Sequence, residues 1–155
     1  MGWNVNFLSD YKTQVKFINK LKGLQENLFI LCDARLDCRS QRVFEKLWGE
    51  GAYFNSFSSS QRGLAILFRD SLPVKEVKVS NIIEGNYSRI TFKVKNHNVL
   101  LKAVYAPNED MLKNKYSSTF FKTVFDDEDD NDFDIKTIVG AVSYTHLTLP
   151  TICSV

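Results

Sequence analysis

The chain has 155 residues, of which 44% are hydrophobic, 13% aromatic and 25% charged, a composition typical of a globular domain with its own core. No apolar run is long enough to cross a membrane, and the first residues lack the pattern of a secretion signal. We therefore expect no membrane partner. The three cysteines, Cys32, Cys38 and Cys153, form no metal or disulfide framework. Their odd number favours a reducing intracellular location, nuclear or cytoplasmic, with buried or idle thiols.

The net charge of +2 conceals an uneven distribution along the chain. Seven of the 18 acidic residues lie within Asp126–Asp134 (DDEDDNDFD), so the remaining residues carry a net charge of +9. A basic body suits a polyanionic partner such as DNA, although a solvated surface explains it equally well. The acidic run lacks the glycine and the final glutamate of an EF-hand loop, which favours a solvated loop over a calcium site.

The first half of the sequence predicts helices that alternate with strands. Apolar residues recur at helical spacing from Tyr11 to Leu21, between a cap at Ser9 or Asp10 and a stop at Gly23. A second helix is predicted at Ser40–Trp48, ending at Gly49. Short strands are predicted at Asn27–Cys32, Tyr53–Phe57, Gly63–Arg69 and Val74–Ser80.

The second half is dominated by a predicted hairpin at Tyr87–Ala106. Apolar and polar residues alternate from Arg89 to Lys95, as in a half-buried strand, and Asn96–Asn98 is the expected turn, which includes His97. Pro107 ends the returning strand because it lacks a backbone donor. A helix with Leu112, Tyr116 and Phe120 and a buried strand at Ile135–Val139, broken at Gly140, complete the pattern. This order predicts a mixed α/β fold, with helices outside a sheet that becomes a two-sheet sandwich if more strands follow.

Polar residues stand at or near the ends of three predicted strands. Alternation along WNVN (Trp3–Asn6) places Asn4 and Asn6 on the same side, where the two amides form either a turn or oxygen ligands for a metal. Asp33 leaves a buried strand at its carboxyl end, where open α/β sheets tend to bind ligands, or it is a loop aspartate paired with Arg35. Tyr105 is either a core tyrosine or a donor to a phosphoryl oxygen.

Five short segments, taken in order, resemble the endonuclease/exonuclease/phosphatase superfamily of DNase I-like proteins. They are WNVN, LCDARL (Leu31–Leu36), RGLAILF, VYAPN (Val104–Asn108) and TIVG (Thr137–Gly140). The resemblance is closest to the apurinic-endonuclease-like domain that precedes reverse transcriptase in non-LTR retrotransposons. It implies that residues 1–140 are the N-terminal part of a four-layered α/β sandwich. It also implies a nuclease that nicks DNA with Mg²⁺, or with Mn²⁺ in its place, in a parent protein fused to a reverse transcriptase.

The same resemblance assigns roles to individual residues. Asp33 stands where the superfamily has a metal-binding glutamate, and it would hold the ion together with Asn6. Asn4 would lie in the same pocket as part of the catalytic group, and Arg35 would support it by hydrogen bonds. Tyr105 and Asn108 would steady the scissile phosphate.

The sequence departs from the superfamily after Gly140, where G-D-F-N is expected and GAVS stands instead. The general base, its orienting asparagine and a later histidine therefore have no counterpart, since neither His97 nor His146 fits. Val142–Thr151 (VSYTHLTLPT) is similar to a translated sequencing-library adaptor, so we expect residues 141–155 to be a non-native tail joined at Ala141. On this interpretation the second sheet is mostly absent, and the chain folds poorly and cleaves nothing measurable.

Two other functions remain open from the sequence. A phosphodiesterase or phosphatase acting on lipid or inositol phosphates would share the superfamily motifs, and a basic body also suits anionic headgroups. A non-catalytic nucleic-acid-binding remnant is favoured by the aspartate at position 33, because its side chain is one methylene shorter than glutamate.

Overall fold

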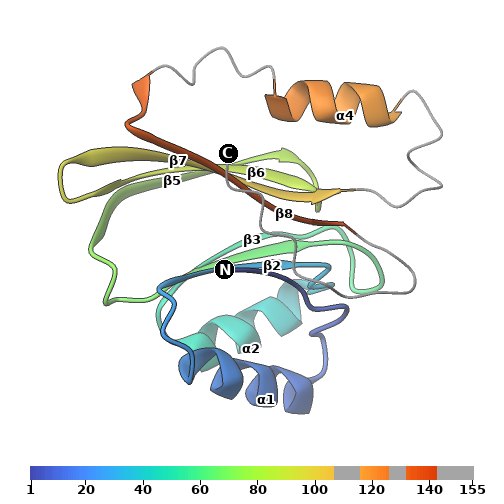
Figure 1. The fold of residues 1–155 in the computed structure, drawn as a ribbon. Helices are drawn as coiled ribbons and strands as arrows, with labels where there is room; N and C mark the ends of the chain where they lie inside the picture. The colour runs from blue at the N-terminus through green and yellow to red at the C-terminus, as the bar shows by residue number, and fades with distance from the viewer. Residues whose placement is uncertain (107–115, 126–131, 143–155) are drawn as a thin grey trace.

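A computed structural model of the chain describes residues 1–106, 116–125 and 132–142. Their strands form two four-stranded sheets that pack face to face, with helices on the two outer sides (Figure 1). From bottom to top in Figure 1 the layers are two helices, a sheet, a second sheet and one helix. The arrangement is a four-layered α/β sandwich of the expected DNase I-like type. No helix in the described part of the chain is long and apolar enough to span a membrane.

The first sheet contains the N-terminal strands, in the spatial order β1-β2-β4-β3. Strands β1 (Gly2–Asn4) and β2 (Leu28–Cys32) are parallel, and β4 (Leu64–Phe68) is antiparallel to both β2 and β3 (Gly51–Asn55). Helices α1 (Tyr11–Lys22) and α2 (Cys38–Trp48) cover its outer face, where they bury Ile18, Leu21, Phe44 and Trp48 against Phe29, Leu31 and Leu67.

The second sheet has the order β5-β6-β7-β8. Strands β5 (Val74–Ile83), β6 (Tyr87–Val94) and β7 (His97–Ala106) form an antiparallel meander, and β8 (Ile135–Val142) joins parallel to β7. Helix α4 (Tyr116–Phe125) lies on the outer face, where Phe120 and Val124 pack against Tyr87 and Val104.

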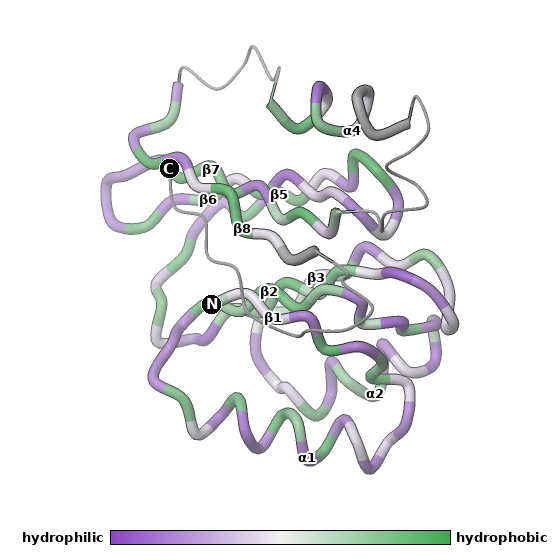
Figure 2. Tube along the Cα trace, turned by 45° about the vertical axis from the view of Figure 1, so that its right-hand side comes forward, coloured by the Kyte–Doolittle hydropathy of each residue, from purple (hydrophilic) through white to green (hydrophobic). Residues whose placement is uncertain are grey.

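The core between the sheets is built by alternate residues of both. Ile30 and Ile66 of the first sheet meet Ile90 and Leu101 of the second, and all four are fully buried. Figure 2 shows hydrophobic stretches along β2 and β3, whereas α1 alternates between polar and apolar residues. The expectation that the second sheet would be mostly absent is wrong, because four strands of the described chain already form it and cover the inner face of the first.

The capping residues predicted for the helices are confirmed, but α2 begins two residues earlier than predicted. Asp10 caps α1 by accepting a hydrogen bond from the Thr13 N–H, and Gly23 ends it. Helix α2 ends at Gly49 as expected but begins at Cys38 rather than Ser40, because the Asp37 carboxylate accepts from the Ser40 N–H two residues further into the helix.

Several predicted strand boundaries are wrong, and the strand expected at Val74–Ser80 is β5, which continues to Ile83. The strand expected at Tyr53–Phe57 is β3 at Gly51–Asn55, since pairing with β4 begins at Gly51. The hairpin turn is Lys95-Asn96, because Lys95 adopts φ 54°, so His97 begins β7 opposite Val94 rather than lying in the turn.

The strand expected to break at Gly140 instead continues to Val142. Strand β7 runs alongside it and pairs with it, with Val104 opposite Gly140 and Ala106 opposite Val142. The strand is also less buried than expected, since Ile135 and Lys136 are exposed and the next four residues are half-buried.

Candidate functional site

The carboxyl ends of four strands lie at one edge of the sandwich (right-hand side of Figure 1). Strand β1 runs parallel to β2, and β7 runs parallel to β8. The two pairs are joined across the sheets where the Cys32 Sγ donates to the Val104 carbonyl at 3.7 Å. A side chain at Gly2 would lie 2.7 Å from Val139 Cγ1, so β1 and β8 also approach closely. The carboxyl-terminal parts of the two strand pairs therefore lie close together although they belong to different sheets.

Asn4 is the last residue of β1 and lies beside Cys32 at the end of β2. Its side-chain oxygen accepts a hydrogen bond from the Asn6 N–H at 3.2 Å, which closes a turn. Asn6 and Phe7 have φ angles of 43° and 95°, so the strand stops before them. The prediction that Asn4 and Asn6 share one side of a strand is therefore wrong. Asn4 is half-buried at the site, and Asn6 is exposed.

Asp33 follows β2 directly and is tightly held by Arg35. The guanidinium donates to both carboxylate oxygens, from Nε at 2.9 Å and from Nη2 at 2.8 Å. The Asp33 side chain is 4% exposed and that of Arg35 is 31% exposed. Both residues have positive φ angles, and the Ala34 and Arg35 N–H groups donate to the carbonyls of Gly63 and Arg62. The loop is thus fixed by backbone bonds as well as by the ion pair.

The ion pair sets the electrostatics of this loop, which lies beside β7. Hydrogen bonding to the Asp33 carboxylate is the largest influence on the pKa of the Arg35 guanidinium, which lies above its ordinary value although partial burial opposes the rise. The charge of Asp33 acts in the same direction. Tyr105 follows Val104 in β7, and the bond from Cys32 to the Val104 carbonyl brings this end of β7 next to the end of β2. We call Asn4, Asp33, Arg35 and Tyr105 the strand-end site.

Tyr105 is 6% exposed and its ring belongs to the core between the sheets. Its backbone is fixed by Asn86, since the Tyr105 N–H donates to the Asn86 carbonyl at 2.7 Å and the Asn86 side chain donates to the Tyr105 carbonyl at 2.7 Å. Asn86 also accepts from the Arg62 guanidinium at 3.2 Å. The Tyr105 ring is therefore largely a core residue, although its strand ends at the open edge of the sandwich.

Two buried asparagines that support the site are absent from the sequence prediction. Asn55 donates to the carbonyls of Ile83 and Tyr87 and to the Ser88 hydroxyl, and its oxygen accepts from the Gly85 N–H. Asn86 holds β7 as described above. A Gly85-Asn86 pair between two strands is a turn signal that the sequence offers. Nothing local to Asn55 indicates its partners, which lie about thirty residues away.

The remaining predicted site residue, Asn108, lies outside the described residues, as does His146. Cys32 is buried and Cys38 is exposed, and the two thiols are not joined in a disulfide. The acidic run is described only from Asp132 onward, where the Asp134 carboxylate accepts from the Asn98 N–H.

The strand-end site offers oxygen atoms, the kind of ligand that a hard divalent cation prefers, but it offers few of them. Within residues 1–106, 116–125 and 132–142, no three histidine, cysteine or acidic side chains come together. Asp33 supplies one carboxylate, whose oxygens keep further lone pairs beyond the two bonds from Arg35, and Asn4, at the end of the neighbouring strand, carries an amide oxygen that already accepts from the Asn6 N–H. Mg²⁺ is commonly held by one or two carboxylates while it keeps several waters. The residues present therefore fit a weakly held, hydrated Mg²⁺ ion.

A four-layered α/β sandwich with polar strand ends at one edge defines the DNase I-like class of folds, and solved structures of this class match the chain. A humanized D. rerio TDP2 superimposes with a TM-score of 0.67 at 12% identity, over 90% of this chain and 59% of that structure. A truncated Caenorhabditis elegans TDP2 gives 0.53 at 13% identity, over 77% of this chain and 51% of that structure.

A functionally unknown conserved protein from Enterococcus faecalis V583 gives a TM-score of 0.59 at 12% identity, over 90% of this chain and 64% of that structure. The chain thus spans between half and two thirds of the length of these three structures. The sequence matches no protein-family model and no curated protein. At this level of identity the comparisons establish the fold.

Proposed function

We propose that the chain is the N-terminal part of a metal-dependent phosphodiesterase that cleaves DNA. The observation that carries this proposal is that Asn4, the Asp33–Arg35 pair and Tyr105 stand at the carboxyl ends of β1, β2 and β7, where the two sheets of a DNase I-like sandwich approach each other. The similarity to TDP2 structures and the basic charge of the chain outside the acidic run support a nucleic-acid substrate.

Each residue of the strand-end site has a distinct role in the proposal. Asp33 would hold a Mg²⁺ or Mn²⁺ ion with Asn4 beside it, and Asn6 at the adjacent turn would contribute an oxygen. When bound, the ion would neutralise charge on the phosphoryl group and lower the pKa of a bound water. Arg35 fixes the orientation of the Asp33 carboxylate through two hydrogen bonds. Tyr105 and Asn108 would bind the scissile phosphate.

The finer proposal is that the parent is the endonuclease of a non-LTR retrotransposon, fused to a reverse transcriptase and acting inside the cell. Its support is the ordered set of segments WNVN, LCDARL and VYAPN. We also propose that the superfamily sequence ends at Gly140, although Ala141 and Val142 still pair with Tyr105 and Ala106 in β8. Residues 141–155 would then replace the segment that carries the general base.

Restoring the G-D-F-N segment tests the function directly. The triple variant Ala141→Asp, Val142→Phe and Ser143→Asn would regain the general base and its orienting asparagine but not the later histidine, and a general base typically contributes about 10²–10⁴-fold to rate. We expect the 155-residue chain to leave supercoiled plasmid intact and the restored variant to nick it slowly in the presence of Mg²⁺. The measurement is conversion of supercoiled to open-circular plasmid on a gel.

The matched control is the restored variant with Asp33→Ala in addition, which should return to background. Anisotropy of a labelled DNA duplex would be measured in parallel. A folded restored variant that binds the duplex but never nicks it would contradict the proposal and favour a non-catalytic remnant. Phosphate release from a soluble inositol phosphate, without nicking, would point to the lipid-phosphate alternative.

A further inference from the structure

A cavity of about 450 Å³ lies between the N-terminal ends of α1 and α2. Its lining includes Tyr11, Gln14, Asp37, Arg39 and Ser40. The segments that leave β1 and β2 lead directly into these two helices, so the cavity lies at the same edge of the molecule as the strand-end site (Figure 1). Its volume is within the range of small-molecule sites.

Gln14 is the first sign that this cavity takes a ligand. The residue is 1% exposed, and its side-chain amide donates to the Leu8 carbonyl at 2.7 Å and to the Ser40 carbonyl at 3.1 Å. Its oxygen, Oε1, has no hydrogen-bond donor among the residues that the structure describes. An unsatisfied buried acceptor is unfavourable. Because Oε1 itself is shielded, an N–H group in the cavity would reach it once the Gln14 side chain shifts toward the opening.

Asp37 adds a second acceptor to the same lining. Its carboxylate accepts from the Ser40 N–H and hydroxyl, both at 2.7 Å, and these bonds hold its pKa below the ordinary value. The carboxylate is therefore ionised at neutral pH and can only accept hydrogen bonds. The Asp37 carboxylate and Gln14 Oε1 are both hydrogen-bond acceptors, so the polar part of the cavity favours ligands with hydrogen-bond donors.

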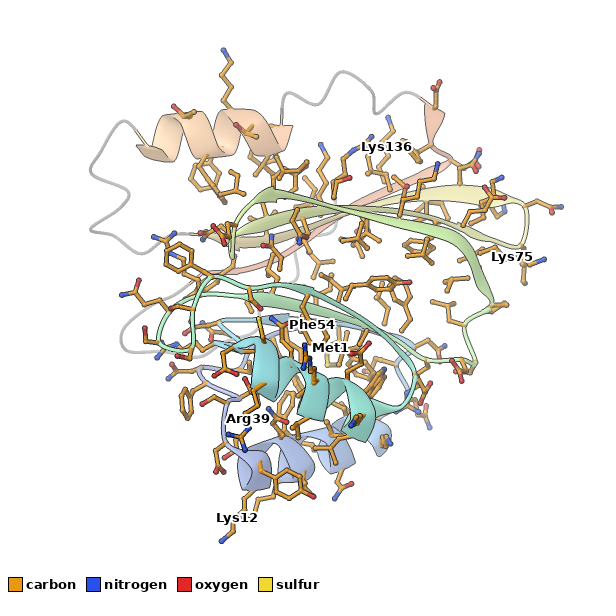
Figure 3. The ribbon with its side chains drawn as sticks, turned by 180° about the vertical axis from the view of Figure 1, so that it is seen from behind. Met1, Lys12, Arg39, Phe54, Lys75 and Lys136 are labelled. Atoms are coloured by element: carbon orange, nitrogen blue, oxygen red, sulfur yellow. The ribbon has the colours of Figure 1, made fainter. Side chains whose placement is uncertain are left out.

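Tyr11 and Arg39 supply two further kinds of contact. Both side chains are exposed, and Tyr11 is 60% exposed, which is unusual for an aromatic residue without a partner to cover it. Figure 3 shows Arg39 where α2 begins, next to α1. An exposed tyrosine ring offers a stacking surface to a planar base, and a guanidinium offers paired donors to a phosphate.

We propose that this cavity binds a nucleobase with an exocyclic amino group, from a nucleotide that flanks the scissile phosphate. Adenine and cytosine carry this group on the major-groove edge and guanine carries it on the minor-groove edge, whereas thymine has no amino group on either edge. The base would stack on Tyr11 and donate to Gln14 or Asp37, and Arg39 would contact its phosphate. This inference rests on the proposed function, because it assumes a DNA substrate.

Binding of the four deoxynucleoside 5′-monophosphates to the 155-residue chain, measured by calorimetry without added metal, tests the inference. We expect the monophosphates of adenine, cytosine and guanine to bind more tightly than that of thymine. Tyr11→Ala should weaken binding by about 5- to 150-fold, the factor that corresponds to the 1–3 kcal/mol of base stacking. Arg39→Gln should weaken it and reduce its salt dependence.

Arg42→Gln is the matched control, since Arg42 is an exposed arginine on the same helix that does not line the cavity. Equal affinity for all four monophosphates, or affinity unchanged by Tyr11→Ala, would overturn the inference. If mononucleotides fail to bind while the restored variant still nicks plasmid, the inference falls and the proposed function stands. If they bind as expected while the restored variant never nicks, the cavity stands and the proposed function falls.

Discussion

Arg35 donates to both carboxylate oxygens of Asp33, and both residues adopt left-handed backbone conformations, with φ angles of 50° and 59°. The guanidinium therefore lies on the same loop as the carboxylate that it neutralises. Because the Asp33 side chain is only 4% exposed, Arg35 provides the compensation that a buried charge needs. A metal ion at Asp33 would have to bind beside this pair.

Removing the Arg35 guanidinium should lower the free energy of unfolding more than removing an exposed guanidinium does. In Arg35→Gln the Asp33 carboxylate keeps little of its compensation, and we expect a loss of about 1–3 kcal/mol in the free energy of unfolding, which urea denaturation would measure. The double variant Asp33→Asn with Arg35→Gln should recover part of that loss, because the buried charge is gone. A loss no larger than that of the exposed Arg39→Gln would contradict this account.

The buried amide of Asn55 should be a major stabilising contact between the sheets. Asn55→Ala removes an NH2 group whose two hydrogens are shared among three acceptors, and leaves the Gly85 N–H without its acceptor. We expect a loss of at least about 2 kcal/mol.

Asn27→Ala is the matched control for Asn55, because Asn27 is an exposed asparagine whose side-chain oxygen accepts a hydrogen bond from the Ser71 hydroxyl at 2.7 Å. Its loss should be under about 1 kcal/mol. Similar losses for the two variants, measured by urea denaturation, would show that burial of the Asn55 network contributes nothing extra.

Gly85 should tolerate no side chain. It has φ 70°, and an added Cβ would lie 2.8 Å from Phe57 Cβ and 3.0 Å from Arg62 Cβ. The left-handed conformation alone costs an alanine about 1–2 kcal/mol, and the two contacts add to it. Gly23→Ala is the control, since Gly23 has φ −78° and its nearest neighbour would lie at 3.4 Å. Thermal denaturation should show a clear fall in Tm for Gly85→Ala, and an equal fall for Gly23→Ala would contradict the explanation.

The helix cap at Asp37 should make stability depend on acid. Hydrogen bonds from the Ser40 N–H and hydroxyl lower the pKa of Asp37 in the folded chain below 3.8, its ordinary value. Its contribution to stability is therefore present above the pKa of the unfolded chain and is lost as the pH falls toward the folded pKa.

Asn caps a helix about as well as Asp but does not titrate, so Asp37→Asn isolates this effect. Between about pH 5 and about pH 3 the Tm of Asp37→Asn should fall less than that of the unsubstituted chain. Parallel falls, followed by circular dichroism, would rule out a contribution from this cap.

The elements that could be predicted from sequence are those whose signals are local. Asp10 and Gly23 bound α1 through side-chain and backbone bonds within a few residues. The alternation of Ile90 and Phe92 with charged residues likewise fixes which side of β6 faces the core. The Asp33–Arg35 pair, two residues apart, was one of two interpretations that the sequence left open, and the structure contains it.

The features that could not be predicted depend on distant partners. Gly140 lies inside β8 because β7 pairs with it, and no neighbouring residue carries that information. Asn6 leaves the strand through its own φ angle of 43°, which the alternation of WNVN does not reveal. The end of β7 approaches the end of β2 only because two sheets stack, so the strand-end site was predictable as a set of candidates but not as a geometry.

The contact between Cys32 and Val104 ties the width of the strand-end site to the thickness of the sandwich. Asp33 belongs to one sheet and Tyr105 to the other, so the gap between them opens or closes with whatever fills the interior. A larger residue at the fully buried Ala103 would push the two sheets apart and spread the polar groups without touching any of them. The volume of the core between the sheets therefore sets the distance between the polar groups of the strand-end site.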